Sequence, residues 1–156
     1  MKSIYLDSSV PSAYYERSER GRVTRKWWDE KIKSYKVLVS VLTLRELEAL
    51  KTEERRRALL LLVKGFPVLK VDSAAQELAA SYIEKKVIPP NVPNDALHIA
   101  LAVINKVDML LSWDFAHMVR PEVEKKINIL NMMSGYSRIC IISPEKLLKE
   151  ERSYLA

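Results

Sequence analysis

Short apolar runs alternate with helical stretches along most of this chain, and this alternation restricts its fold more than any other feature. The runs are continuously apolar, whereas a strand with one solvated face would alternate apolar and polar residues. Continuous runs are typical of a parallel sheet that helices cover on both faces. We therefore predict an α/β fold, a three-layer α/β/α sandwich with a central, mainly parallel sheet. Its strands are expected at residues 3–6, 37–41, 67–71, 108–112 and 138–142.

The length and composition fit one globular domain. The chain has 156 residues, 48% of them hydrophobic, and no repeat, linker or shift of composition divides it. We therefore expect a single domain over residues 1–156. Its only cysteine, Cys140, lies in an apolar run, so we expect it to be a small buried core residue. One cysteine permits neither an internal disulfide nor a cysteine-based zinc site.

The sequence predicts a cytoplasmic protein with no membrane contact. The N-terminal segment carries an acid at its seventh position and lacks the long apolar region of a signal peptide. The most apolar window, residues 96–112, is interrupted by polar residues and is shorter than the ~20 apolar residues that span a bilayer. The net charge of +6 favours an anionic partner such as nucleic acid.

Four acidic residues fall where a doubly wound sheet would bring them to one cleft. Asp7 ends the first predicted strand and Asp114 follows the fourth, while Glu46 and Asp95 lie in helices. Ligands of such folds gather at the carboxyl ends of the strands. Carboxylates repel one another, so a cluster of them is stable only around a cation or when partly protonated. We therefore predict a Mg²⁺ or Mn²⁺ site suited to phosphodiester chemistry.

Each of these acids also has a purely local interpretation. Asp7 and Asp114 could cap the segments that follow them, and Asp95, after a cap at Asn94, would be favoured by the helix dipole. Glu46 stands three residues after Thr43, which is the spacing of a capping box. Two further acids are interpreted as structural or remote: Asp72 beside a helix start, and Asp108 at the opposite edge of the sheet.

Four segments in this order resemble a known family. They are YLDSS with Asp7 and Ser9, RELE with Glu46, DALHIALA from Asp95, and LLSWDFAH with Asp114. Together they resemble the PIN-domain nucleases, and within them the VapC-type toxins of prokaryotic toxin–antitoxin pairs, over nearly the whole chain. The fourth segment departs slightly, because the family often has Thr-x-Asp where this chain has Ser112-Trp113-Asp114.

The resemblance implies one PIN-like domain and a Mg²⁺- or Mn²⁺-dependent endoribonuclease. Asp7, Glu46, Asp95 and Asp114 would form the acidic cluster, with Ser9 or Ser112 as a supporting hydroxyl. In this hypothesis Asp7, Asp95 and Asp114 hold one or two ions, and Glu46 joins them or orients the attacking water. The resemblance also implies an RNA substrate, a cognate antitoxin protein and a homodimer. The alternative is a catalytically silent PIN-like module that binds RNA or protein.

Other features of the sequence leave two interpretations open. The basic stretch Arg20–Lys26, next to Trp27 and Trp28, would suit single-stranded RNA, or else the tryptophans are core and the charges are solvated. The run ALLLLV at 58–63 is a candidate antitoxin contact or plain core. His98 and His117 either touch the substrate or are bystanders, and they are too far apart in sequence for a zinc motif.

Two other phosphate-handling classes lack their required residues. A haloacid-dehalogenase-type phosphatase needs a second Asp two residues after the first, where this chain has Ser9. A receiver domain needs an acidic pair before the first helix and a lysine late in the sheet, and neither is apparent.

Overall fold

The computed structural model describes residues 1–155, and the side chains of residues 1–151. A five-stranded sheet forms the middle layer, with strand order β3-β2-β1-β4-β5. Every pairing is parallel, which confirms the predicted sandwich. The strands are β1 (Ser3–Leu6), β2 (Lys36–Ser40), β3 (Val68–Leu69), β4 (Met109–Leu111) and β5 (Cys140–Ile142). The chain starts at the central strand and builds outward on both sides, so the order reverses at β1.

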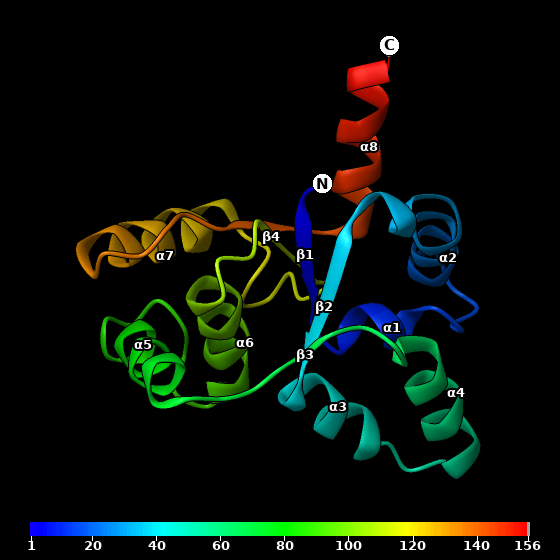
Figure 1. Ribbon diagram of the computed structural model, residues 1–156, viewed down its shortest axis with the longest axis horizontal. Helices are drawn as coiled ribbons and strands as arrows, with labels where there is room; N and C mark the ends of the chain where they lie inside the picture. Colours follow the sequence, from blue (N-terminus) through cyan, green and yellow to red (C-terminus); the bar gives the residue numbers. More distant parts are fainter. Residues whose placement is uncertain (156) are drawn as a thin grey trace.

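Helices cover both faces of this sheet (Figure 1). One side carries α5 (Ser73–Glu84), α6 (Pro93–Ile104) and α7 (Pro121–Met133). The other side carries α1 (Ser9–Ala13), α2 (Glu19–Lys31), α4 (Glu53–Val63) and α8 (Pro144–Leu155). The helix α3 (Val41–Glu48) follows β2 directly, and a short 3₁₀ turn, η1 (Ile32–Ser34), precedes β2.

The continuous apolar runs arise because each strand supplies both layers of core. Tyr5 and Leu110 pack on the side of α5 and α6. Their neighbours Ile4, Leu6 and Leu111 pack on the side of α2 and α4. Successive side chains of a strand point to opposite faces, so two buried faces require apolar residues at every position.

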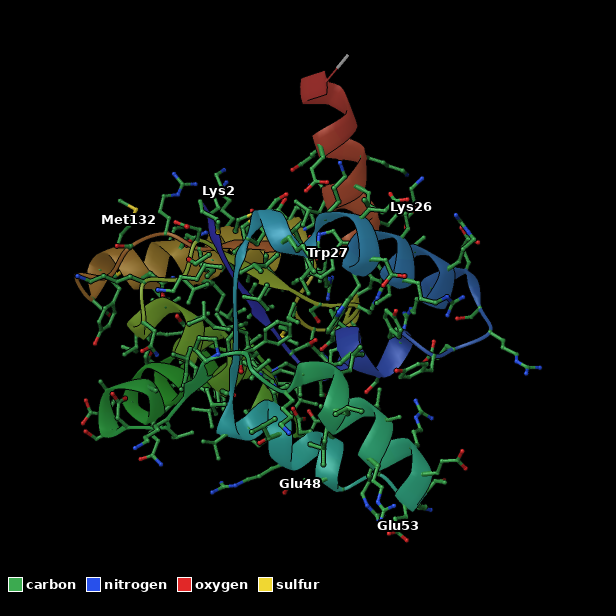
Figure 2. All side chains as sticks on the ribbon, turned by 45° about the vertical axis from the view of Figure 1, so that its right-hand side comes forward. Lys2, Lys26, Trp27, Glu48, Glu53 and Met132 are labelled. Atoms are coloured by element: carbon green, nitrogen blue, oxygen red, sulfur yellow. The ribbon has the colours of Figure 1, made fainter. Side chains whose placement is uncertain are left out.

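The tryptophans of α2 belong to the second core layer. Trp27 is fully buried and Trp28 is 7% exposed. Figure 2 shows Trp27 beneath α2, on its inner side. Neither ring can therefore serve as a stacking platform for RNA bases, and the interpretation of these residues as core is confirmed.

The helix that carries Glu46 begins earlier than its sequence suggests. Ser40, not Thr43, is the N-cap of α3, and its Oγ accepts a hydrogen bond from the backbone N–H of Thr43 at 3.2 Å. Glu46 therefore lies beyond the first turn, where a capping box has no use for it. The predicted capping role of Thr43 and Glu46 is wrong, and the local explanation for Glu46 is removed.

Several other boundaries also differ from the prediction. Helix α6 begins at Pro93, so Asn94 is not its cap, although Asp95 does lie in the first turn. The helical pattern of residues 115–133 is realised only from Pro121, where α7 begins, and residues 115–118 form turns. Cys140 is exposed, because it opens the edge strand β5 and does not point into the core. The predicted burial of Cys140 is therefore wrong.

The most apolar helix is α6, which packs between the sheet and α5. It is 12 residues long. Within the described residues, no helix combines the length and the apolar character that crossing a bilayer requires.

Candidate active site

Asp7 is the most enclosed of the four predicted acids, with 3% of its surface exposed. It follows the central strand β1, and its two carboxylate oxygens are held separately. Oδ1 accepts hydrogen bonds from the backbone N–H of Ser9 at 3.1 Å and from Ser9 Oγ at 2.6 Å. Oδ2 accepts one from Ser112 Oγ at 2.6 Å. The carboxylate is therefore fixed in orientation.

The same two hydroxyls join the loop after β1 to the loop after β4. Ser9 Oγ accepts the backbone N–H of Trp113 at 2.9 Å. Ser112 Oγ accepts the backbone N–H of Asp114 at 3.0 Å. Each serine thus donates to Asp7 and accepts from the segment that carries Asp114. This geometry suits the supporting role expected of both serines.

Asp95 and Asp114 approach each other across the gap between α6 and the loop after β4. Burial, together with the hydrogen bond and the negative charge of the Asp114 carboxyl, raises the pKa of Asp95 to about 7. The position of Asp95 in the first turn of α6 favours the anion, but burial and the neighbouring carboxyl outweigh that effect. Two carboxylates held this close favour a shared proton or a cation between them.

Asp114 also performs the local role that its sequence allows. Its Oδ1 accepts the backbone N–H groups of Ala116 and His117, both at 3.0 Å, and so caps the turn that follows. The capping interpretation of Asp114 and its proximity to Asp95 are therefore compatible.

The pKa of Asp7 is also raised. Burial is the main cause, and Glu46 adds to it through its negative charge. His98 and the hydroxyls of Ser112 and Ser9 act in the opposite direction. Asp7 contributes in turn to the raised pKa of Asp95. The four acids therefore share one electrostatic environment at the carboxyl edge of β1 and β4.

Glu46 forms a hydrogen bond with a histidine of α6. His98 lies on α6, one turn after Asp95, and is 2% exposed. Its Nε2 bonds Glu46 Oε1, and its Nδ1 bonds the hydroxyl of Tyr5 at 2.6 Å. The sequence offered His98 only as a substrate contact or a bystander. Its spacing of three residues from Asp95 places both residues on one side of α6, and this spacing indicates that His98 lies near the acids.

The donor set fits a hard divalent cation, although the side chains are not arranged as a complete ligand shell. Within the described residues, no three His, Cys, Asp or Glu side chains lie close enough together to hold a metal ion. The available donors are carboxylate and hydroxyl oxygens, the ligands that Mg²⁺ and Mn²⁺ prefer. Mg²⁺ keeps several of its waters, so it needs only one or two direct carboxylates. Burial and, after it, the Asp114 carboxyl raise the pKa of Asp95, and a bound cation would favour its ionised form.

Aromatic and basic side chains surround the loop that carries Asp114. Trp113 is buried and donates from Nε1 to Thr24 Oγ1 at 2.9 Å, which ties the loop to α2. The guanidinium of Arg20 lies over the Trp113 ring, 5.4 Å from its centroid. Phe115 is 46% exposed and borders a cavity of about 370 Å³. Arg20 and Phe115 thus flank the loop that carries Asp114.

Most of the chain matches a family of known proteins in sequence. The family model described as PIN domain matches residues 4–116, a range that includes all four acids. Among curated proteins none matches the chain.

Two solved structures share the fold at low sequence identity. VapC20 from Mycobacterium tuberculosis, described as a sarcin-ricin loop cleaving toxin, is 17% identical, with a TM-score of 0.59 over 74% of this chain and 92% of its own. FitAcB from Neisseria gonorrhoeae is 16% identical, with a TM-score of 0.60 over 90% of this chain and 97% of that chain.

Proposed function

Because this chain belongs to the PIN domain family, we propose that it is a divalent-metal-dependent endoribonuclease and the toxin of a toxin–antitoxin pair. The observation that carries the proposal is the pair Asp95–Asp114 beside the buried Asp7, in which the pKa of Asp95 rises to about 7. Burial and the neighbouring carboxyl make the ionised form of Asp95 costly, and a bound cation would offset that cost.

Asp7, Asp95 and Asp114 would hold Mg²⁺ or Mn²⁺, directly or through its waters. When bound, such an ion supplies positive charge for the phosphate and lowers the pKa of an attacking water. Ser9 and Ser112 keep the Asp7 carboxylate in one orientation. Asp114 is held in turn by the backbone groups that it caps.

Glu46 would orient the attacking water and accept its proton. Its Oε1 is bonded to His98, and among the described contacts its Oε2 has no protein partner. The side chain is 30% exposed, so Oε2 is open to water and substrate. Arg20, over the Trp113 ring next to Asp114, is suited to bind a phosphate of the RNA.

The test is cleavage of a mixed pool of labelled RNAs by the purified protein, with Mn²⁺ or Mg²⁺ and with EDTA. We expect cutting that requires metal and disappears in Asp95→Asn. The matched control is Asp72→Asn, because Asp72 caps α5 by accepting the Ala75 N–H at 2.8 Å, and Asn is an equally good cap. Cutting that survives in Asp95→Asn would exclude this site. RNA binding without any cutting would establish the silent binding module instead.

The antitoxin partner rests on the toxin description of the similar VapC20 structure and on an exposed apolar face. In α4, Leu59 and Val63 are buried, whereas Leu61 is 70% exposed, so this leucine run exceeds what the core covers. Expression of the protein should arrest growth, Asp95→Asn should not, and co-expression of a small protein encoded beside the gene should restore growth. Growth arrest by Asp95→Asn as well would argue against a nuclease toxin. The homodimer belongs to the same proposal, and sedimentation velocity tests it.

A further inference from the structure

His98 sits at the centre of a buried hydrogen-bond relay that the proposed chemistry does not use. Beyond its bonds to Glu46 and Tyr5, the relay continues through the Tyr5 hydroxyl to Ser40 Oγ at 2.7 Å. Tyr5 is fully buried, and so is Ser40. The only member of the relay with appreciable exposure is Glu46, at its open end.

The other contacts of the relay assign the direction of each hydrogen bond. Thr43 Oγ1 donates to the Leu6 carbonyl, and Ser40 Oγ accepts the Thr43 N–H. The Ser40 hydroxyl is closer to the Tyr5 hydroxyl, at 2.7 Å, than to Thr43 Oγ1, at 3.4 Å, so its hydrogen is directed to Tyr5. With His98 neutral, Tyr5 donates to His98 Nδ1, and His98 donates from Nε2 to Glu46. Every donor meets one acceptor, and the carboxylate receives a proton donor of fixed position.

The relay also connects the elements that bear three of the four acids. Tyr5 lies in β1 shortly before Asp7, and Ser40 caps α3, which carries Glu46. His98 lies on α6, one turn from Asp95. The positions of Asp7, Glu46 and Asp95 are therefore related through side chains as well as through backbone packing.

A structural role alone would not require this chemistry. Burying hydroxyl and imidazole groups costs free energy, and their hydrogen bonds compensate for that cost without adding to stability. A leucine would fill the same volume without the cost. What an apolar side chain cannot do is orient a carboxylate. Among the members of the relay, only Glu46 faces the acid cluster from a solvent-accessible position.

We propose that His98 is a positioning residue for Glu46, held by Tyr5 so that its Nε2 fixes the Glu46 carboxylate toward the attacking water. This inference rests on the proposed nuclease function, and it adds a residue outside the acidic set. His98 itself touches neither substrate nor metal. Its loss should lower the turnover rate and leave the binding of RNA and metal in place.

Two substitutions separate orientation from volume. In His98→Gln the amide nitrogen can occupy the place of Nε2 and donate to Glu46, whereas the side chain of His98→Asn is too short to reach it. Both variants keep a polar group at the buried position, and circular dichroism and thermal unfolding verify that each folds. We expect kcat to fall about 10–100-fold in His98→Asn and to recover largely in His98→Gln. KM for RNA and the Kd of Mn²⁺, measured by calorimetry, should stay unchanged in both.

A double-substitution cycle tests whether the two residues act as one unit. If His98 acts through Glu46, the double variant Glu46→Gln/His98→Asn should be no slower than Glu46→Gln alone. Losses that multiply would overturn the proposal, and so would a His98→Asn protein with the kcat of the wild type.

A spectroscopic readout keeps this inference distinct from the proposed function. The sequence has only two histidines, so side-chain ¹H–¹⁵N spectra resolve the tautomer of His98. We expect the Nε2–H tautomer, and a shift of its signal in Glu46→Gln. If the wild type cuts no RNA, the proposed function fails on that result. An unchanged His98 signal in Glu46→Gln would overturn the positioning role independently of any cleavage, and a shifted one would support the contact.

Discussion

Asp95 keeps its proton to a pH at which most aspartates have long lost theirs. Its pKa of about 7 reflects burial first and the Asp114 carboxyl second. The position of Asp7, Ser9 and Ser112 could be predicted from the sequence, because strand ends and short loops determine it. The bond between Glu46 and His98 could not, because the two residues are 52 positions apart and meet only when α3 and α6 take their places around β1.

The protonation of Asp95 makes the stability of the metal-free protein depend on pH. An unfolded aspartate loses its proton near pH 3.9. Between that value and about 7 the folded state binds more protons, so the free energy of unfolding falls as the pH rises. We expect the Tm in EDTA to fall from pH 5 to pH 8 and the fall to be smaller in Asp95→Asn, which should melt higher than the wild type at pH 8. Parallel melting curves for the two proteins would contradict the assignment.

Ser112 should matter for stability and for metal binding together. Ser112→Ala removes the donor to the buried Asp7 and the acceptor of the partly buried Asp114 N–H. We expect the free energy of unfolding to fall by about 1–3 kcal/mol, with weaker Mn²⁺ binding by calorimetry. The control is Ser81→Ala, whose hydroxyl bonds only the Leu78 carbonyl within α5 and whose loss should leave Mn²⁺ binding unchanged. Equal Mn²⁺ affinity in Ser112→Ala and the wild type would count against the role of Asp7 as a ligand.

At the scale of elements, the sequence predicted the sandwich and its strand positions because continuous apolar runs have few alternatives. It misplaced the start of α3 because no loop separates that helix from β2. Ser40 ends the strand and Val41 already begins the helix, and a β-branched apolar residue fits either. The strands β3, β4 and β5 are shorter than the ranges predicted for them, because only two or three residues of each pair with a neighbouring strand.

One close approach between elements depends on a glycine. A Cβ at Gly21 of α2 would lie 2.0 Å from the carbonyl oxygen of Glu16, in the segment that joins α1 to α2. Gly→Ala inside a helix ordinarily stabilises by about 0.5–1 kcal/mol, but here the clash reverses the sign. We expect Gly21→Ala to lower the free energy of unfolding by about 1–3 kcal/mol in denaturant titrations. A stabilised variant would show that the segment joining α1 to α2 can move away from the added Cβ.

At the scale of the whole molecule, the charge of +6 should make RNA binding strongly dependent on salt. Each phosphate contact to single-stranded RNA contributes about −0.7 to the slope of log affinity against log salt. Three to four contacts would weaken binding roughly 15- to 50-fold between 50 and 200 mM salt. Binding to Asp95→Asn, which should not cut, allows this measurement by anisotropy. Arg20→Ala should reduce the magnitude of the slope by about 0.7, the contribution of one phosphate contact. An unchanged slope would show that Arg20 does not contact RNA.

The hydrogen bond between Asp7 and Ser112 joins positions 105 residues apart. At a synthesis rate of about 5–20 residues per second, β1 therefore leaves the ribosome roughly 5–20 s before its partner β4. Until then Asp7 and Asp114 belong to separate parts of an unfinished sheet, and the nascent chain has no assembled acid cluster. Under the proposed function, a nuclease of this topology would become active only after most of its chain is released, which leaves time for an inhibitor to be made and to bind it.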